Sequence, residues 1–378
     1  MSGLQDTSPN PLPPEATGAP PSAQSILFKV LSAGFSGALI VLIIVWFHTK
    51  LVEYGSDVGD AIKSLSIVQI VGLLIGGVVI MTLNAMAMRA PLTGISRGKA
   101  FIAQQSCSAV SNVIPGPSGT AARFAILYSW GVGVEDFTRA TVAVSIWSNV
   151  CMISMPGLAF LILAISGDST YDGTNLVVAA IVSVIISIIS LAVVAGALRS
   201  EAFARWLGRV AARIVNPTRR LFRKPPQTDL PAQAVQLRQR TVDVVRNKAT
   251  RLTVITVGNY WFNGLMLVLC MWVGGVPHTV LPMLVGLALY SIGRVATIVQ
   301  VTPGGVGVVE VAYTAVYMTV VPEQYRAQVI TGILLYRLLT YIAPILVGGV
   351  CYLLWRVMRD REKHAATAAA AASSVAAG

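Results

Sequence analysis

The sequence predicts an all-α polytopic membrane protein with an inverted-topology repeat, about six full spans and two broken re-entrant helical hairpins. Of its 378 residues, 55% are hydrophobic and 12% are charged, and the mean hydropathy is +0.71. Soluble proteins carry about 25% charged residues. Several apolar runs approach the ~20 residues that cross a bilayer as a helix. Two further apolar regions are each interrupted by a Pro-Gly turn.

The elements follow in order from the amino terminus. Residues 1–25 are rich in Pro, Ser and Gly, so we expect a disordered tail. The membrane domain is expected over 26–357, followed by an Ala-rich C-terminal tail over 358–378. Apolar runs predict full spans at 26–47, 65–88, 140–166, 174–198, 252–273 and 329–355.

The two broken regions cover 100–132 and 283–320. Pro115-Gly116-Pro117 divides the first, and Pro303-Gly304-Gly305 divides the second. Each half has only about 15 residues, which is short for a full crossing. Each region is therefore either a re-entrant hairpin or two short helices that both cross the membrane. The later spans have the same orientation in both cases.

Basic residues set the expected orientation. Of the 28 Lys and Arg residues, 13 lie in the loop 199–251, against three acids. The positive-inside rule predicts that this loop is cytoplasmic, and alternation then places both termini inside a bacterial plasma membrane. We expect no nucleic-acid partner, because no nucleic-acid fold signature accompanies the basic residues. Within the loop, apolar residues from Phe203 to Ile214 recur at helical spacing between arginines, which indicates an interfacial amphipathic helix.

An internal repeat is visible at an offset of 188 positions. The offset aligns the helix-breaking residues of the two broken regions, placing Val113, Pro115, Gly116 and Gly119 on Val301, Pro303, Gly304 and Gly307. It also aligns Pro156 with Pro344. We predict repeat one over 65–166 and repeat two over 252–355. One additional span, 174–198, lies between the repeats, so the second repeat has the opposite orientation in the membrane.

Inverted repeats with interrupted helices are typical of transporters, whose sites lie where the two interruptions meet. A new helix begins after each turn, and its free N–H groups favour an anion such as phosphate. Intramembrane charges are costly and usually functional. The candidate substrate-binding residues are the two turns and the charges near them: Pro115, Gly116, Gly119, Arg123, Arg294, Pro303, Gly304, Gly305, Gly307, Glu310 and Arg337. Two structural alternatives stay open. The turns could serve only to bend helices, and Glu310 could neutralise any one of the three arginines.

Enzyme signatures are absent from the sequence. The three histidines are scattered, the four cysteines lack metal-ligand spacing, and no Gly-Lys-Ser/Thr phosphate loop occurs. We therefore expect no catalytic residue, no metal and no cofactor.

The segment Thr302–Glu310, together with Tyr336–Tyr341 and Pro344, resembles the flippase-like transmembrane family, which includes the membrane half of lysylphosphatidylglycerol synthases. Pro115–Gly119 and Arg123 are similar to the upstream motif of that family, and the likeness covers about residues 30–355. The resemblance implies a lipid-translocating domain. Unlike the fused members, the chain is expected to carry no soluble aminoacyl-transferase domain, so we expect no synthase activity, and a lysyl-lipid substrate is in doubt.

We therefore expect translocation of an anionic or lipid-linked phosphate-bearing substrate between leaflets. One alternative is a non-transporting scaffold subunit of a lipid-modifying or glycan-transferring enzyme, which would then be its partner. The other is a secondary carrier for a small organic anion.

Overall fold

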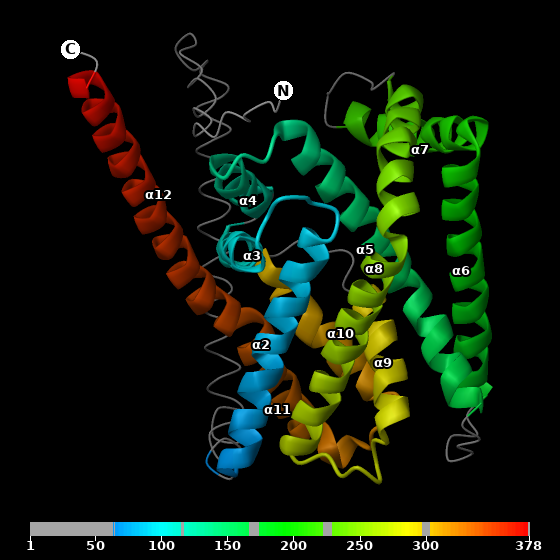
Figure 1. The fold of residues 1–378 in the computed structure, drawn as a ribbon. Coiled ribbons are helices and arrows are strands. Elements are labelled where there is room, and N and C mark those ends of the chain that lie inside the picture. Colours follow the sequence, from blue (N-terminus) through cyan, green and yellow to red (C-terminus); the bar gives the residue numbers. More distant parts are fainter. Residues whose placement is uncertain are drawn as a thin grey trace.

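The computed structural model describes residues 65–114, 117–165, 174–221, 229–296 and 303–376, together with Lys63. The predicted tail 1–25, the first span 26–47 and the turn residues Pro115 and Gly116 lie outside the described residues. All regular elements in these ranges are helices, labelled as in Figure 1.

Five helical segments are long and apolar enough to cross a membrane. They fall in α2 (Ile67–Arg89), α5 (Val134–Ile165), α6 (Thr174–Arg199), α8 (Leu230–Val273) and the stretch from α11 (Arg326–Arg337) into α12 (Ala343–Ala376). These positions coincide with the five predicted spans that lie within the described ranges. The polytopic all-α class is confirmed, and the number of full crossings stays a prediction.

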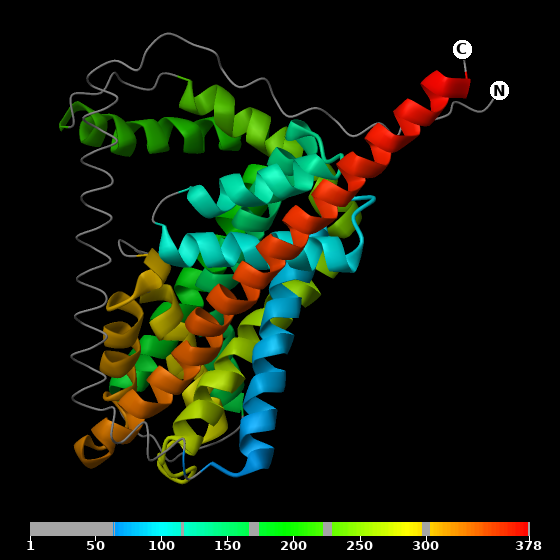
Figure 2. The same ribbon diagram turned by 90° about the vertical axis from the view of Figure 1, so that its left-hand side faces the viewer.

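The basic segments gather at one end of the helical bundle. Helices α2, α6 and α12 run towards this end, whereas α5 and α8 run away from it (Figures 1 and 2). The α2–α3 connection, with Arg89 and Arg97, lies there, as do α7 (Glu201–Leu221) and the C-terminus. This arrangement is the one that the distribution of Lys and Arg predicts, and the side of the membrane stays a prediction.

The two broken regions differ in direction. Helices α3 (Arg97–Val113) and α4 (Ser118–Ser129) lie across the bundle, seen end-on in Figure 1 and side-on in Figure 2. Helices α9 (Met283–Ala296) and α10 (Val308–Tyr317) run along it. All four are shorter than the ~20 residues of a full crossing. Under the offset of 188 the bounds of α4 and α10 agree within two residues, as do the starts of α3 and α9. The duplication itself stays a prediction.

Two segments contain more helix than we expected from composition. The basic loop 199–251 consists largely of α7 and the first half of α8. The predicted C-terminal tail from 358 is helical through Ala376, as the end of α12. Alanine has the highest intrinsic helix propensity, so an Ala-rich stretch that follows a helix can continue it.

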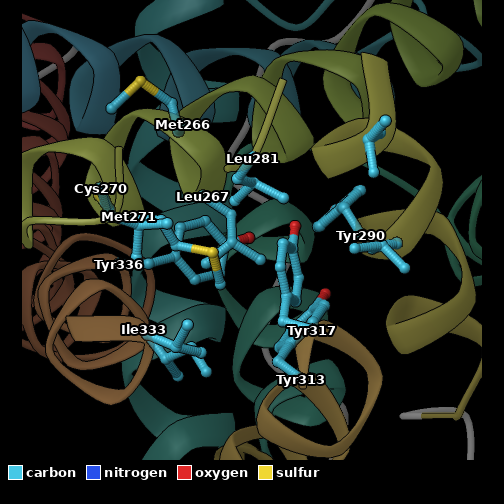
Figure 3. Close-up of a cluster of buried hydrophobic side chains, with 14 of the residues drawn as sticks. Met266, Leu267, Cys270, Met271, Leu281, Tyr290, Tyr313, Tyr317, Ile333 and Tyr336 are labelled. Atoms are coloured by element: carbon cyan, nitrogen blue, oxygen red, sulfur yellow. The ribbon is translucent and has the colours of Figure 1, made fainter. Parts of the chain in front are cut away.

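The larger of two buried hydrophobic clusters in the described residues lies mainly between α8, α9, α10 and α11. Tyr290 of α9 stacks on Tyr313 of α10, with ring centroids 5.8 Å apart, and Tyr336 of α11 meets Tyr313 edge-on. Figure 3 shows these rings among aliphatic and sulfur-containing side chains, which include Met271 and Ile333. This packed cluster supports one wall of the cavity described next.

Candidate functional site

A cavity of about 440 Å³ lies where the two broken regions meet α2, α5 and α8. Its volume is within the ~300–1,000 Å³ range of small-ligand sites. Three arginines reach it, Arg123 from α4, Arg294 from α9 and Arg337 from α11. The other polar residues of its lining are Asn84, Gln104, Gln105, Ser108, Ser111, Asn112, Ser148, Thr256, Asn259, Tyr260, Asn263, Tyr290, Tyr313, Tyr336 and Thr340.

Arg123 is held by the first hairpin. Its Nη1 donates to Oε1 of Gln104 on α3 at 2.9 Å, and its guanidinium carbon lies 5.9 Å from the centre of the Phe137 ring. The Nε of Arg123 is buried and has no hydrogen-bond partner among the residues that the structure describes. A buried donor of this kind calls for a water molecule or a ligand atom.

Arg294 reaches the cavity from the last turn of α9. Its guanidinium carbon lies 5.9 Å from the ring centre of Tyr260 on α8, within the range of a cation–π contact. The Tyr260 hydroxyl donates to the backbone carbonyl of Ser148 on α5 at 3.2 Å. Arg294 is therefore positioned by a ring that is itself fixed to a third helix.

Arg337 is the ion-pair partner of Glu310. Its Nε donates to Oε1 of Glu310 at 2.6 Å, and both residues are only 8% exposed. Its Nη2 donates to the carbonyl of Gly304 at 2.9 Å, and its guanidinium lies over the Tyr341 ring at 4.6 Å. The structure thus resolves the three-way choice for Glu310 in favour of Arg337.

Glu310 also closes the amino end of α10. Its Oε2 accepts a hydrogen bond from the backbone N–H of Gly307 at 2.7 Å. We expected this helix terminus to attract a ligand anion, but the carboxylate of Glu310 itself is the negative group there. Glu310 is not among the residues that line the cavity, so its contacts support the structural alternative for this residue.

The second Pro-Gly turn forms a short 3-10 segment, Pro303–Gly305, called η1. Gly304, Gly305 and Gly307 all have positive φ, a conformation that L side chains rarely adopt. At Gly304 a Cβ atom would also overlap the Tyr341 ring. Of this turn, Gly304 reaches the cavity, while Gly305 and Gly307 shape the backbone.

The first hairpin contacts the second repeat at its tip. Asn112, near the end of α3, donates its amide to the carbonyl of Tyr341 at 3.3 Å, and the Tyr341 hydroxyl donates back to the carbonyl of Asn112 at 3.1 Å. Tyr341 lies in a π-helical turn, η3 (Leu338–Ile342), just before Pro344. Gly119 packs α4 against α3, where a Cβ atom would overlap Ser111, and it does not line the cavity.

The cavity also contains amides that the sequence prediction missed. Asn259 of α8 donates to Asn84 of α2 at 3.0 Å, Asn263 donates to Asn259, and the Tyr336 hydroxyl donates to Asn263 at 3.1 Å. This chain of hydrogen bonds connects α2, α8 and α11 along one wall. The available signal was the presence of single asparagines in otherwise apolar spans, where polar residues usually face the bundle interior.

The fold and the cavity define a polytopic α-helical membrane protein with an arginine-rich polar chamber beside two broken helices. The chain belongs to the family described as the lysylphosphatidylglycerol synthase transmembrane region, whose model matches residues 28–348. This family is related to lipid biosynthesis and flippase-like function. A search of curated proteins found no match to the chain.

Proposed function

We propose that this protein moves a lipid with a phosphate-bearing headgroup between the two leaflets of the bacterial plasma membrane. The observation that carries the proposal is the arrangement of Arg123, Arg294 and Arg337 around one cavity inside a bundle of apolar helices. A guanidinium group binds phosphate oxygens in a bidentate geometry, which makes arginine the preferred side chain for this ligand.

The surroundings of the cavity suit a lipid. The outward faces of α2 and α6 expose large aliphatic side chains, such as Leu74, Ile75, Ile185 and Ile188. Such faces are stable only against acyl chains or other apolar surface. A headgroup could therefore occupy the polar chamber while its acyl chains stay in the hydrocarbon, which lowers the cost of moving the charge across the membrane.

The cavity also offers hydrogen bonds that replace those a headgroup loses when it leaves water. Amide side chains and guanidinium groups line the cavity and provide hydrogen-bond donors there. Each polar group left without a hydrogen bond in hydrocarbon costs about 2–7 kcal/mol. Such donors are therefore needed on any path that a phosphate takes through the membrane.

The test is a translocation assay in proteoliposomes. The purified full chain is reconstituted with phosphatidylglycerol carrying a fluorophore on one acyl chain, and dithionite then bleaches the outer leaflet. We expect bleaching beyond the outer-leaflet fraction with wild-type protein, and the rate of protein-free liposomes with Arg123→Ala. Equal rates for wild-type protein and empty liposomes would contradict the proposal and favour the scaffold alternative. Protein-dependent uptake of a water-soluble organic phosphate instead would favour the carrier alternative.

A further inference from the structure

We infer that the headgroup taken by this cavity is a phosphodiester whose remaining part is neutral and rich in hydroxyl groups, and that headgroups bearing an amine are excluded. This inference rests on the proposed function and narrows its substrate class. It follows from the charges and the neutral polar groups of the chamber.

The described part of the chamber offers no carboxylate to an amine. The described residues that line the cavity include no Asp or Glu. In the sequence, Glu310 is the only acid between Val244 and Pro322, and there is none from Ala61 to Val134 or from Phe137 to Gly167. The two oxygens of Glu310 already accept hydrogen bonds from Arg337 and from the N–H of Gly307, and Glu310 is not among the described lining residues.

The formal charge of the chamber is positive in the described part of the chain. Three guanidinium groups line it, and among the described residues only Glu310, which pairs with Arg337, brings a carboxylate close to it. An ammonium group that entered would leave water, meet cations at close range and find no negative side chain. Desolvating a charge without a partner is among the most unfavourable events in a protein interior. A phosphodiester with no amine avoids this penalty.

Neutral hydrogen-bonding groups of the chamber match a headgroup rich in hydroxyls. Asn84, Asn259 and Asn263 form a wall of amides, and Gln104 and Ser108 face the chamber from α3. Amide and hydroxyl groups both donate and accept, as the hydroxyls of glycerol, inositol or a sugar do. The Thr256 hydroxyl lines the same wall, is buried and has no hydrogen-bond partner within the described ranges. A ligand hydroxyl would satisfy it.

The experiment compares headgroups in the proteoliposome assay. Four lipids with the same labelled acyl chain are used: phosphatidylglycerol, phosphatidylinositol, phosphatidylethanolamine and lysylphosphatidylglycerol. We expect the first two to cross at least about tenfold faster than the two amine-bearing lipids, which corresponds to a difference of at least about 1.4 kcal/mol between the headgroups.

A carboxylate placed in the chamber should reverse the selectivity. Asn84→Asp is suited to this purpose, because the Oδ1 atom of Asn84 is the acceptor for Asn259 and an aspartate keeps an acceptor there. The control is Asn216→Asp on α7, which adds the same charge outside the cavity. We expect Asn84→Asp to slow phosphatidylglycerol and to speed the lysyl lipid, and Asn216→Asp to change neither rate.

The outcomes separate the two proposals. Lysylphosphatidylglycerol crossing as fast as phosphatidylglycerol, or all four lipids crossing equally, overturns the inference and leaves translocation intact. If no lipid crosses faster than in empty liposomes, the proposed function fails, and the inference falls with it.

Discussion

The side chains of Arg337 and Glu310 form a buried ion pair in which Nε of the arginine lies 2.6 Å from Oε1 of the carboxylate. The pair connects α11 to the amino end of α10, and the Nη2 of Arg337 donates a hydrogen bond to the Gly304 carbonyl. The same arginine therefore fixes the second Pro-Gly turn, the start of α10 and one side of the cavity.

Removing one member of this ion pair should lower the stability of the protein more than removing both members. Glu310→Ala leaves a buried guanidinium without its carboxylate, and we expect it to lower the free energy of unfolding by about 3–5 kcal/mol. The double variant Glu310→Ala/Arg337→Ala restores charge balance and should be more stable than Glu310→Ala alone. Thermal unfolding in detergent, followed by tryptophan fluorescence, measures both. A double variant less stable than either single variant would show that the ion pair is not the main interaction.

Arg123 should be required for transport and not for folding. We expect Arg123→Ala to reduce lipid translocation by about tenfold or more, because a guanidinium that faces the chamber is lost. Arg139→Ala is the matched control, since Arg139 forms an exposed pair with Glu135 one helix further on, and exposed pairs contribute only about 0–1 kcal/mol. Both variants should elute as folded protein in size-exclusion chromatography. Equal transport by the two variants would remove Arg123 from the site.

Two adjacent glycines of α12 should respond oppositely to alanine. At Gly348 a Cβ atom would overlap the backbone carbonyl of Gln105, so Gly348→Ala should destabilise the α12–α3 contact by about 1–3 kcal/mol. At Gly349 nothing lies within 4 Å, and Gly349→Ala should be neutral or stabilise the helix by up to about 1 kcal/mol. Melting temperatures in detergent distinguish the two. Equal shifts would argue against the close crossing of these helices.

The hydrogen bond from Tyr336 to Asn263 should contribute measurably to stability. Tyr336→Phe removes the hydroxyl that donates at 3.1 Å and leaves Asn263 short of one partner, which should cost about 1 kcal/mol. Tyr352→Phe on the exposed face of α12 is the control, because its ring is retained and no hydrogen bond of its hydroxyl is found in the described part of the chain. If the control is destabilised as much as Tyr336→Phe, the loss does not come from the amide wall.

The features readable from the sequence were those with a local cause. Three consecutive helix-breaking residues, Pro303, Gly304 and Gly305, predict a turn in an apolar run, and the structure turns there. Arg123, Arg294 and Arg337 are conspicuous in apolar segments because charge at membrane depth is rare, and the structure brings all three to one cavity. Their role in substrate binding stays a prediction.

Other features depend on tertiary contacts that no local pattern encodes. By sequence, three arginines were equally plausible ion-pair partners of Glu310. Glu310 pairs with Arg337 because of how α11 lies against α10. Hydropathy indicates that a helix lies in the membrane but not the angle at which it lies. The crosswise direction of α3 and α4 was therefore not predictable. Asn84 and Asn259 are 175 positions apart in the chain, and only the packing of α2 on α8 makes them partners.

The most direct test of the account is to find where a lipid headgroup contacts the protein. Phosphatidylglycerol carrying a photoreactive diazirine on its headgroup is added to the reconstituted full chain, irradiated and mapped by mass spectrometry of the peptides. We predict adducts on cavity residues of both α3 and α8, such as Gln104 and Asn259, and their loss in Arg123→Ala. Adducts confined to the outer faces of α2 and α6, unchanged by Arg123→Ala, would contradict a headgroup path through the cavity.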